Sequence, residues 1–144
     1  MDVLKTATII LVIAMLFSGA YSLLIVFAPQ RIAESTLEAR TGKVLADVQD
    51  PGVAGTIVVQ TRHMGVFALC ISIAMFFVLL TGFRKGEKWA WWAFLLVGGI
   101  AWGYGLIMQI IEKDMFNLIL HSIGMVLFLF GLLLPAKIFL AKKA

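Results

Sequence analysis

The sequence predicts an all-α polytopic membrane protein: a four-transmembrane-helix bundle with an amphipathic outer segment. First, 62% of its 144 residues are hydrophobic and only 14% are charged, whereas soluble domains are about 45–50% apolar and about 25% charged. Second, the mean hydropathy is +1.02. Third, four apolar runs are long enough to cross a hydrocarbon core of about 30 Å. We therefore expect one membrane domain over residues 1–144, with spans at 7–28, 64–83, 89–111 and 116–134.

The first span, residues 7–28, has a competing interpretation as a secretory signal peptide. The small residues at 18–20 resemble a cleavage site for signal peptidase. However, a run of about 20 apolar residues is also long enough for a complete span, which is the interpretation we adopt. Pro29 should end this helix, because proline lacks a backbone donor and disfavours helical geometry in the residue before it.

The outer segment, residues 30–62, contains half of the acidic residues of the chain. The apolar residues within it suit one face of a helix over about 34–48, although Gly42 weakens that helix. Such a helix could lie on the membrane surface or cap the bundle. The residues that carry the apolar spacing are Leu37, Val44, Leu45 and Val48.

The second span should begin well outside the membrane. Asp50 and Pro51 suit the N-cap and the first position of a helix. No helix breaker follows from Val53 to Phe83, and at about 1.5 Å per residue such a helix is longer than the membrane is thick. We expect residues 51–61 to project beyond the membrane or to tilt along its surface.

Spans three and four form a hairpin that begins with a basic turn at 84–88. Three tryptophans follow at once, Trp89, Trp91 and Trp92. We expect them to form an aromatic belt at the membrane interface; the alternative is a stacking platform for a ligand. Pro135 should kink or end span four.

The distribution of basic residues predicts the orientation. Four spans place both termini and the 84–88 turn on one side, which carries seven Lys and Arg in short segments, against five on the other side. The positive-inside rule then predicts a multi-pass protein of the cell membrane with both termini cytoplasmic. Because orientation explains the net charge of +4, we expect the lipid bilayer as the partner and no nucleic acid.

Small residues on spans three and four predict close helix contacts. Gly99 and Gly103 form a GxxxG pair, which marks close approach of membrane helices. The pair could pack within the bundle, or it could form a homo-oligomer or bind a larger membrane complex. On span four, a 4-3-4-3 spacing predicts a seam facing the other helices. Its members are Asn117, His121, Gly124, Phe128 and Gly131.

The candidate site is a set of polar side chains in the outer half of the spans. Polar groups inside a membrane usually face inward and carry function. At about 1.5 Å per residue, three of them lie at a similar depth of roughly 8–12 Å, namely Tyr21, Tyr104 and His121. Nearer the outer surface lie Arg62, His63, Gln109, Glu112 and Asn117.

Three interpretations of this set remain open. In a structural network, His121 would bond Tyr104 or Gln109, and Arg62 would pair with Glu112. In a ligand pocket, His121 or Tyr21 would bond the head group of a quinone, isoprenoid or lipid. In acid–base chemistry, His121 would act as the base and Glu112 or Tyr104 as the acid.

Other chemistry lacks sequence support. Two histidines and one cysteine have no metal-ligand spacing, so we predict no metal site and assign no catalytic residue. We find no GxSxG and no P-loop motif. Cys70 lies within a span, where we expect a small buried residue. The cofactor is unassigned, with a quinone or a lipid as the candidates.

The chain resembles the DoxX-like family of small four-helix membrane proteins. The matching features are Gly19 and Tyr21 before Pro29, the stretch at 62–65 (Arg-His-Met-Gly) and the stretch at 88–92 (Lys-Trp-Ala-Trp-Trp). The family's named member is a membrane subunit of a thiosulfate:quinone oxidoreductase. The resemblance implies the fold and a quinone-linked or subunit role, and it transfers no catalytic residue.

The leading hypothesis from the sequence is an accessory or lipid- or quinone-binding membrane protein with a polar pocket in the outer half of the bundle. The first alternative is a membrane enzyme or redox subunit acting on a quinone or isoprenoid. The second is an oligomeric transporter or pore.

Overall fold

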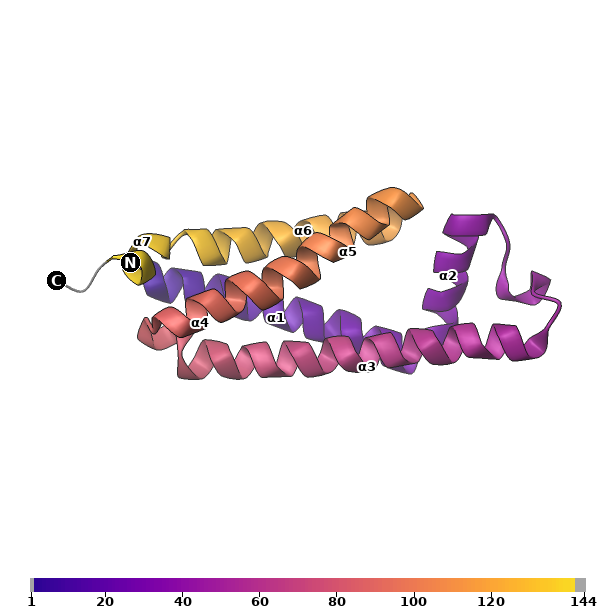
Figure 1. The fold of residues 1–144 in the computed structure, drawn as a ribbon, viewed down its shortest axis with the longest axis horizontal. Helices are drawn as coiled ribbons and strands as arrows, with labels where there is room; N and C mark the ends of the chain where they lie inside the picture. Colours follow the sequence, from indigo (N-terminus) through magenta and orange to yellow (C-terminus); the bar gives the residue numbers. More distant parts are fainter. Residues whose placement is uncertain (1, 142–144) are drawn as a thin grey trace.

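The computed structural model describes residues 2–141, and most of them are helical (Figure 1). Four helical segments are long and apolar enough to cross a membrane, and the described residues include no strand. The predicted four-helix membrane architecture is therefore confirmed. The helices are α1 (Val3–Phe27), α2 (Pro29–Thr41), α3 (Pro51–Thr81), α4 (Lys88–Ala93), α5 (Gly99–Glu112), α6 (Met115–Leu133) and α7 (Ala136–Leu140). Short 3-10 turns cover Leu45–Asp47 and Phe83–Lys85, and a π-helical turn at Phe94–Gly98 joins α4 to α5.

Capping residues and prolines set the end of α1, the start of α3 and the end of α6 as predicted. Helix α1 ends at Phe27, and Pro29 is the first residue of α2. The Asp50 side chain accepts a hydrogen bond of 2.7 Å from the backbone N–H of Gly52, and Pro51 opens α3. Helix α3 then runs for 31 residues, which is roughly 46 Å at 1.5 Å per residue. Helix α6 ends just before Pro135.

The prediction of a helix over 34–48 was wrong at both ends. Helix α2 begins earlier, at Pro29, and ends at Thr41. Gly42 adopts a left-handed φ of 68°, and its N–H bonds the carbonyl of Glu38. This is the usual glycine stop for a helix, and here it overrides the apolar spacing that continues beyond it. The apolar residues after Gly42 belong to a loop with a single 3-10 turn.

Helix α1 lies at the centre of the bundle. It packs against α3 and α6, and α5 packs on α6. In Figure 1 the long helices run side by side in one general direction, whereas α2 stands steeply across that direction at one end. The start of α1, the turn after α3 and helix α7 lie together at the opposite end. We call these the α2 end and the terminal end; four crossings place both ends of the described chain at the latter.

The apolar core lies in the half of the bundle nearest the terminal end. Its centre is an aromatic cluster in which the ring of Phe83 lies 5.3 Å from that of Phe94 and 4.9 Å from that of Phe139. Helix α5, which runs to the α2 end, has no buried residue. The apolar core thus fills the terminal end of the bundle and does not extend to the α2 end. Its members are Ala7, Leu11, Ala14, Met15, Met75, Leu79, Phe83, Ala90, Trp91, Phe94, Phe128, Leu132 and Phe139.

Two expectations about single side chains were wrong. Trp91 is only 5% exposed, and its indole N–H donates a 2.9 Å hydrogen bond to the carbonyl of Leu132. It therefore joins α4 to α6 inside the core instead of belonging to an interfacial belt. Trp89 and Trp92 are exposed, as a belt requires. Cys70 is exposed on α3, not buried.

The structure separates the small residues of span three into two groups. A Cβ built on Gly98 would lie 2.4 Å from the ring of Phe128, so Gly98 faces α6. A Cβ on Gly99 would meet nothing within 4 Å, and one on Gly103 would reach only a methyl at 4.0 Å. Packing of the GxxxG pair inside the bundle is therefore not seen. The predicted seam of span four is confirmed, since His121 is partly buried and its other members are buried.

Candidate functional site

The site begins at the turn between α5 and α6, where Asp114 caps α6. Its carboxylate accepts from the backbone N–H of Asn117 at 3.1 Å and from the side-chain amide of Asn117 at 2.7 Å. Such N-cap bonds satisfy backbone donors that the helix leaves free. Asp114 is 3% exposed and Asn117 is 5% exposed. The turn therefore carries a buried carboxylate bonded to a buried amide.

Asn117 also joins α6 to α1. The hydroxyl of Tyr21 donates a hydrogen bond to the Oδ1 atom of Asn117. The ring of Tyr21 meets the ring of His121 edge to face at 6.3 Å, and Trp102 meets that histidine in the same way at 5.9 Å. The Nδ1 atom of His121 lies 2.9 Å from the carbonyl oxygen of Asn117. Helices α1 and α5 thus each contribute one ring that contacts His121 of α6.

Helix α5 contributes Gly105 and Gln109, which lie one turn apart on the face toward α6. A Cβ on Gly105 would lie 2.6 Å from Cδ2 and 2.8 Å from Nε2 of His121, so the imidazole rests directly on the glycine. The Oε1 atom of Gln109 is buried and has no hydrogen-bond partner among the described residues. An acceptor left in this state costs about 1–3 kcal/mol.

An ion pair between α2 and α5 closes the α2 end of the site. Arg40 of α2 donates to Glu112 at the end of α5. The side chain of Glu112 is 8% exposed and that of Arg40 is 50% exposed. The predicted pairing of Glu112 with Arg62 is wrong, because α2, not α3, supplies the cation. Arg62 and His63 are exposed on α3.

Tyr104 does not join the site. It is 65% exposed. The neighbouring Gly105 faces His121, and adjacent residues on a helix differ by about 100° in direction. The predicted hydrogen bonds of His121 to Tyr104 or Gln109 are not formed. Of the eight predicted site residues, the structure gathers Tyr21, Gln109, Glu112, Asn117 and His121 at the α2 end of α1, α5 and α6.

Sequence reasoning missed four residues of this site. Asp114 had a usable signal, since an aspartate three residues before an asparagine at a helix start is an N-cap spacing. Gly105 and Trp102 had none, because their role depends on which way α5 is rotated. Arg40 depends on where α2 ends, and that boundary was misplaced. The four are Arg40, Trp102, Gly105 and Asp114.

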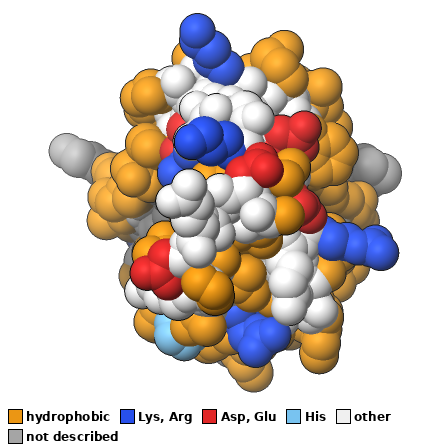
Figure 2. Space-filling model, turned by 90° about the vertical axis from the view of Figure 1, so that its right-hand side faces the viewer, with side chains coloured by type: hydrophobic (Ala, Val, Ile, Leu, Met, Phe, Trp, Pro, Cys, Tyr) orange, Lys and Arg blue, Asp and Glu red, His pale blue; other side chains and the backbone are white. Residues whose placement is uncertain are grey.

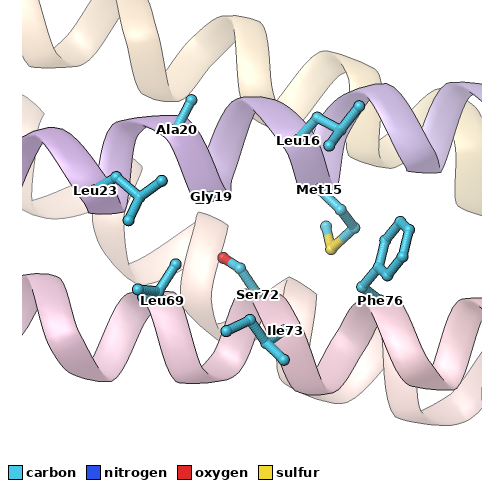
Figure 3. A pocket seen from close by; sticks show the side chains of 9 residues that line it. All are labelled: Met15, Leu16, Gly19, Ala20, Leu23, Leu69, Ser72, Ile73 and Phe76. Atoms are coloured by element: carbon cyan, nitrogen blue, oxygen red, sulfur yellow. The ribbon is translucent and has the colours of Figure 1, made fainter.

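A groove of about 360 Å³ lies between α1 and α3 (Figure 3). The hydroxyl of Ser72 points toward α1 in this view and bonds the hydroxyl of Ser18 at 2.8 Å. Gly19 leaves its wall open, since a Cβ there would meet nothing within 4 Å. The shape and lining suit an apolar chain. The lining residues are Met15, Leu16, Gly19, Ala20, Leu23, Leu69, Ser72, Ile73 and Phe76.

The α2 end of the molecule is polar on its face. Figure 2 shows Lys and Arg side chains interspersed with Asp and Glu there, with hydrophobic side chains around the rim. Between residues 2 and 141, no group of three or more His, Cys, Asp and Glu is placed to hold a metal ion. Comparisons with protein-family models, with curated proteins and with solved structures found no match.

Proposed function

We propose that this chain is an integral membrane accessory protein that binds an amphipathic lipid, of which a quinone or isoprenoid is one class, in the α2-end half of its bundle. The observation that carries the proposal is the buried, unpartnered Oε1 atom of Gln109, one helical turn along α5 from Gly105, which contacts His121. Polar residues within membrane spans are uncommon and usually functional. A ligand head group would supply the partner that the protein does not.

The rest of the bundle supports this assignment. The half nearest the terminal end has a packed apolar core, whereas the half nearest the α2 end holds the network of Tyr21, Asn117 and Asp114. The groove between α1 and α3 lies at the depth of Tyr21 and offers a hollow for an apolar chain. A lipid has a polar head group, which suits the network, and an apolar chain, which suits the groove.

The proposed orientation places both termini in the cytoplasm and the α2 end outside. It is supported by the excess of Lys and Arg in the short terminal segments and in the 84–88 turn. With this orientation, the ligand enters from the outer leaflet. The plasma membrane is the proposed location.

Removing the acceptor of Gln109 should remove the bound lipid. Gln109→Leu keeps a similar volume but loses the amide. We expect lipid that co-purifies with the wild-type chain to fall at least fivefold in the variant, measured by native mass spectrometry from detergent. Tyr104→Leu, on the same helix at similar depth but exposed, is the matched control and should retain lipid. Equal lipid retention by both variants, or no lipid on the wild type, contradicts the proposal.

The geometry gives less support to the alternative of an enzyme or redox subunit, which the DoxX-like resemblance also implies. His121 as a base would need a nearby acid. Glu112 is instead paired with Arg40, and Tyr104 faces away from the bundle. A quinone-linked subunit role without chemistry at His121 is compatible with the lipid-binding proposal.

Self-association through Gly99 and Gly103 is a second proposal, and it is the basis of the transporter or pore alternative. Packing within the chain does not require Gly99, and small residues allow close approach of membrane helices. We expect Gly99→Leu to abolish a dimer in nanodiscs, measured by single-molecule photobleaching, while the thermal stability of the monomer is not lowered. A wild type that is monomeric at every lipid-to-protein ratio would refute this proposal.

A further inference from the structure

We infer that the site at Gln109 and His121 takes a head group that donates hydrogen bonds, so that its ligand is a lipid alcohol or phenol. This inference rests on the proposed lipid-binding function and narrows it. It concerns the direction of the hydrogen bonds, which is set by which protein groups are already bonded. Four side chains carry the argument: Tyr21, Gln109, Asn117 and His121.

The first step fixes the tautomer of the neutral His121 side chain. Its Nδ1 atom lies 2.9 Å from the backbone carbonyl oxygen of Asn117, and a carbonyl oxygen can only accept a hydrogen bond. Nδ1 must therefore carry the hydrogen. In a neutral imidazole, the other nitrogen, Nε2, is then an acceptor. No described residue makes a hydrogen bond to that Nε2.

The second step places a second acceptor nearby. Nε2 of His121 rests over Gly105, where a Cβ would lie 2.8 Å from it. Gln109 lies one turn further along the same face of α5 than Gly105, and its Oε1 atom is buried without a partner. The two free groups are thus both acceptors on one side of the α5–α6 contact.

The third step shows that the hydroxyl of Tyr21 and one N–H of the Asn117 amide are already in use. The hydroxyl of Tyr21 donates to Oδ1 of Asn117, and the side-chain amide of Asn117 donates to Asp114 at 2.7 Å. Neither donor can turn toward Gln109 without breaking a bond that is buried or partly buried. A donor supplied by a ligand would satisfy Oε1 of Gln109 without breaking either of these bonds.

The chemistry of the head group follows from this arrangement. An O–H group on a lipid can donate to Oε1 of Gln109 or to Nε2 of His121. A head group of carbonyls or ethers alone, such as that of an oxidised quinone, would leave both acceptors unsatisfied. Sites built to bond a hydroxyl reject analogues that lack it, because the buried polar groups are then left unpaired.

A matched pair of probes tests this inference: geranylgeraniol and geranylgeranyl methyl ether. They share a chain, but only the alcohol donates. With the full chain in phosphatidylcholine nanodiscs, we expect the alcohol to bind about tenfold more tightly than the ether, measured by native mass spectrometry across a titration. A tenfold ratio corresponds to about 1.4 kcal/mol, which is the order of one or two net hydrogen bonds.

Two variants test whether Gln109 causes the preference for the alcohol over the ether. Gln109→Leu should reduce the ratio between alcohol and ether below about twofold, whereas Gln60→Leu, the same change at an exposed glutamine of α3, should leave it at about tenfold. Equal binding of both probes by the wild type, or tighter binding of the ether, overturns the inference and leaves lipid binding intact. Failure of the wild type to bind either probe overturns the proposed function as well. The comparison of the two probes on the wild-type chain does not depend on whether any variant folds.

Discussion

Asn117→Leu should lower the free energy of unfolding by about 2–3 kcal/mol, because it leaves the hydroxyl of Tyr21 and one carboxylate oxygen of Asp114 without partners. The hydroxyl of Tyr21 and the carboxylate of Asp114 both bond the amide of Asn117. Each unsatisfied buried group costs about 1–3 kcal/mol, and hydrogen bonds between membrane helices lie toward the low end of such values. Titration with sodium dodecyl sulfate in mild detergent, followed by tryptophan fluorescence, measures the change.

Two controls separate the network from the general effect of a substitution on α6. Tyr21→Phe removes one bond of the network and should cost about 1 kcal/mol. Ser122→Ala removes a hydroxyl that bonds only a carbonyl of its own helix, and it should change stability little. A loss for Asn117→Leu no larger than that for Ser122→Ala would mean that the network does not hold α1 to α6.

Gly124→Ala should destabilise the fold by about 1–2 kcal/mol, although alanine is the better helix former. The added Cβ would lie 2.2 Å from two ring carbons of Trp102. Overpacking of this kind costs about 1–3 kcal/mol, which exceeds the gain of up to about 1 kcal/mol in helix propensity. The unfolding titration described above gives the value.

Gly99→Ala is the matched control, since a Cβ there would meet nothing within 4 Å. With no clash to oppose it, the gain in helix propensity should stabilise the chain by roughly 0.5–1 kcal/mol. The two glycine substitutions therefore have opposite expected signs. A stabilising Gly124→Ala would show that Trp102 does not lie against α6.

The sequence was sufficient to predict the four spans because hydrophobicity acts over whole segments. Twenty apolar residues in a row have few alternatives to a membrane helix, and strong caps such as Asp50 and Pro51 set the boundary of α3. The end of α2 was misplaced because one glycine in the left-handed region outweighs several well-spaced apolar residues. Local backbone preferences decided that boundary.

The candidate site was only partly predictable, because the depth of a side chain and the direction in which it points have different causes. Distance along a helix gives depth, and it placed Tyr21 and His121 correctly side by side. The direction of a side chain depends on how each helix is rotated about its axis, which is set by contacts such as that of Gly98 with Phe128. In a span that is apolar on all sides, no hydrophobic stripe reveals this rotation. Tyr104 was therefore assigned to the interior, and Trp91 to the interface.

An experimental density map of the chain in lipid nanodiscs tests the central claim. This claim is that the α2-end half of the bundle contains a polar site whose hydrogen bonds are completed by a bound ligand. The account predicts density from a non-protein molecule within hydrogen-bonding distance of the Gln109 side chain and of Nε2 of His121. A map in which Gln109 bonds another residue of the chain, with no additional density beside His121, would contradict it.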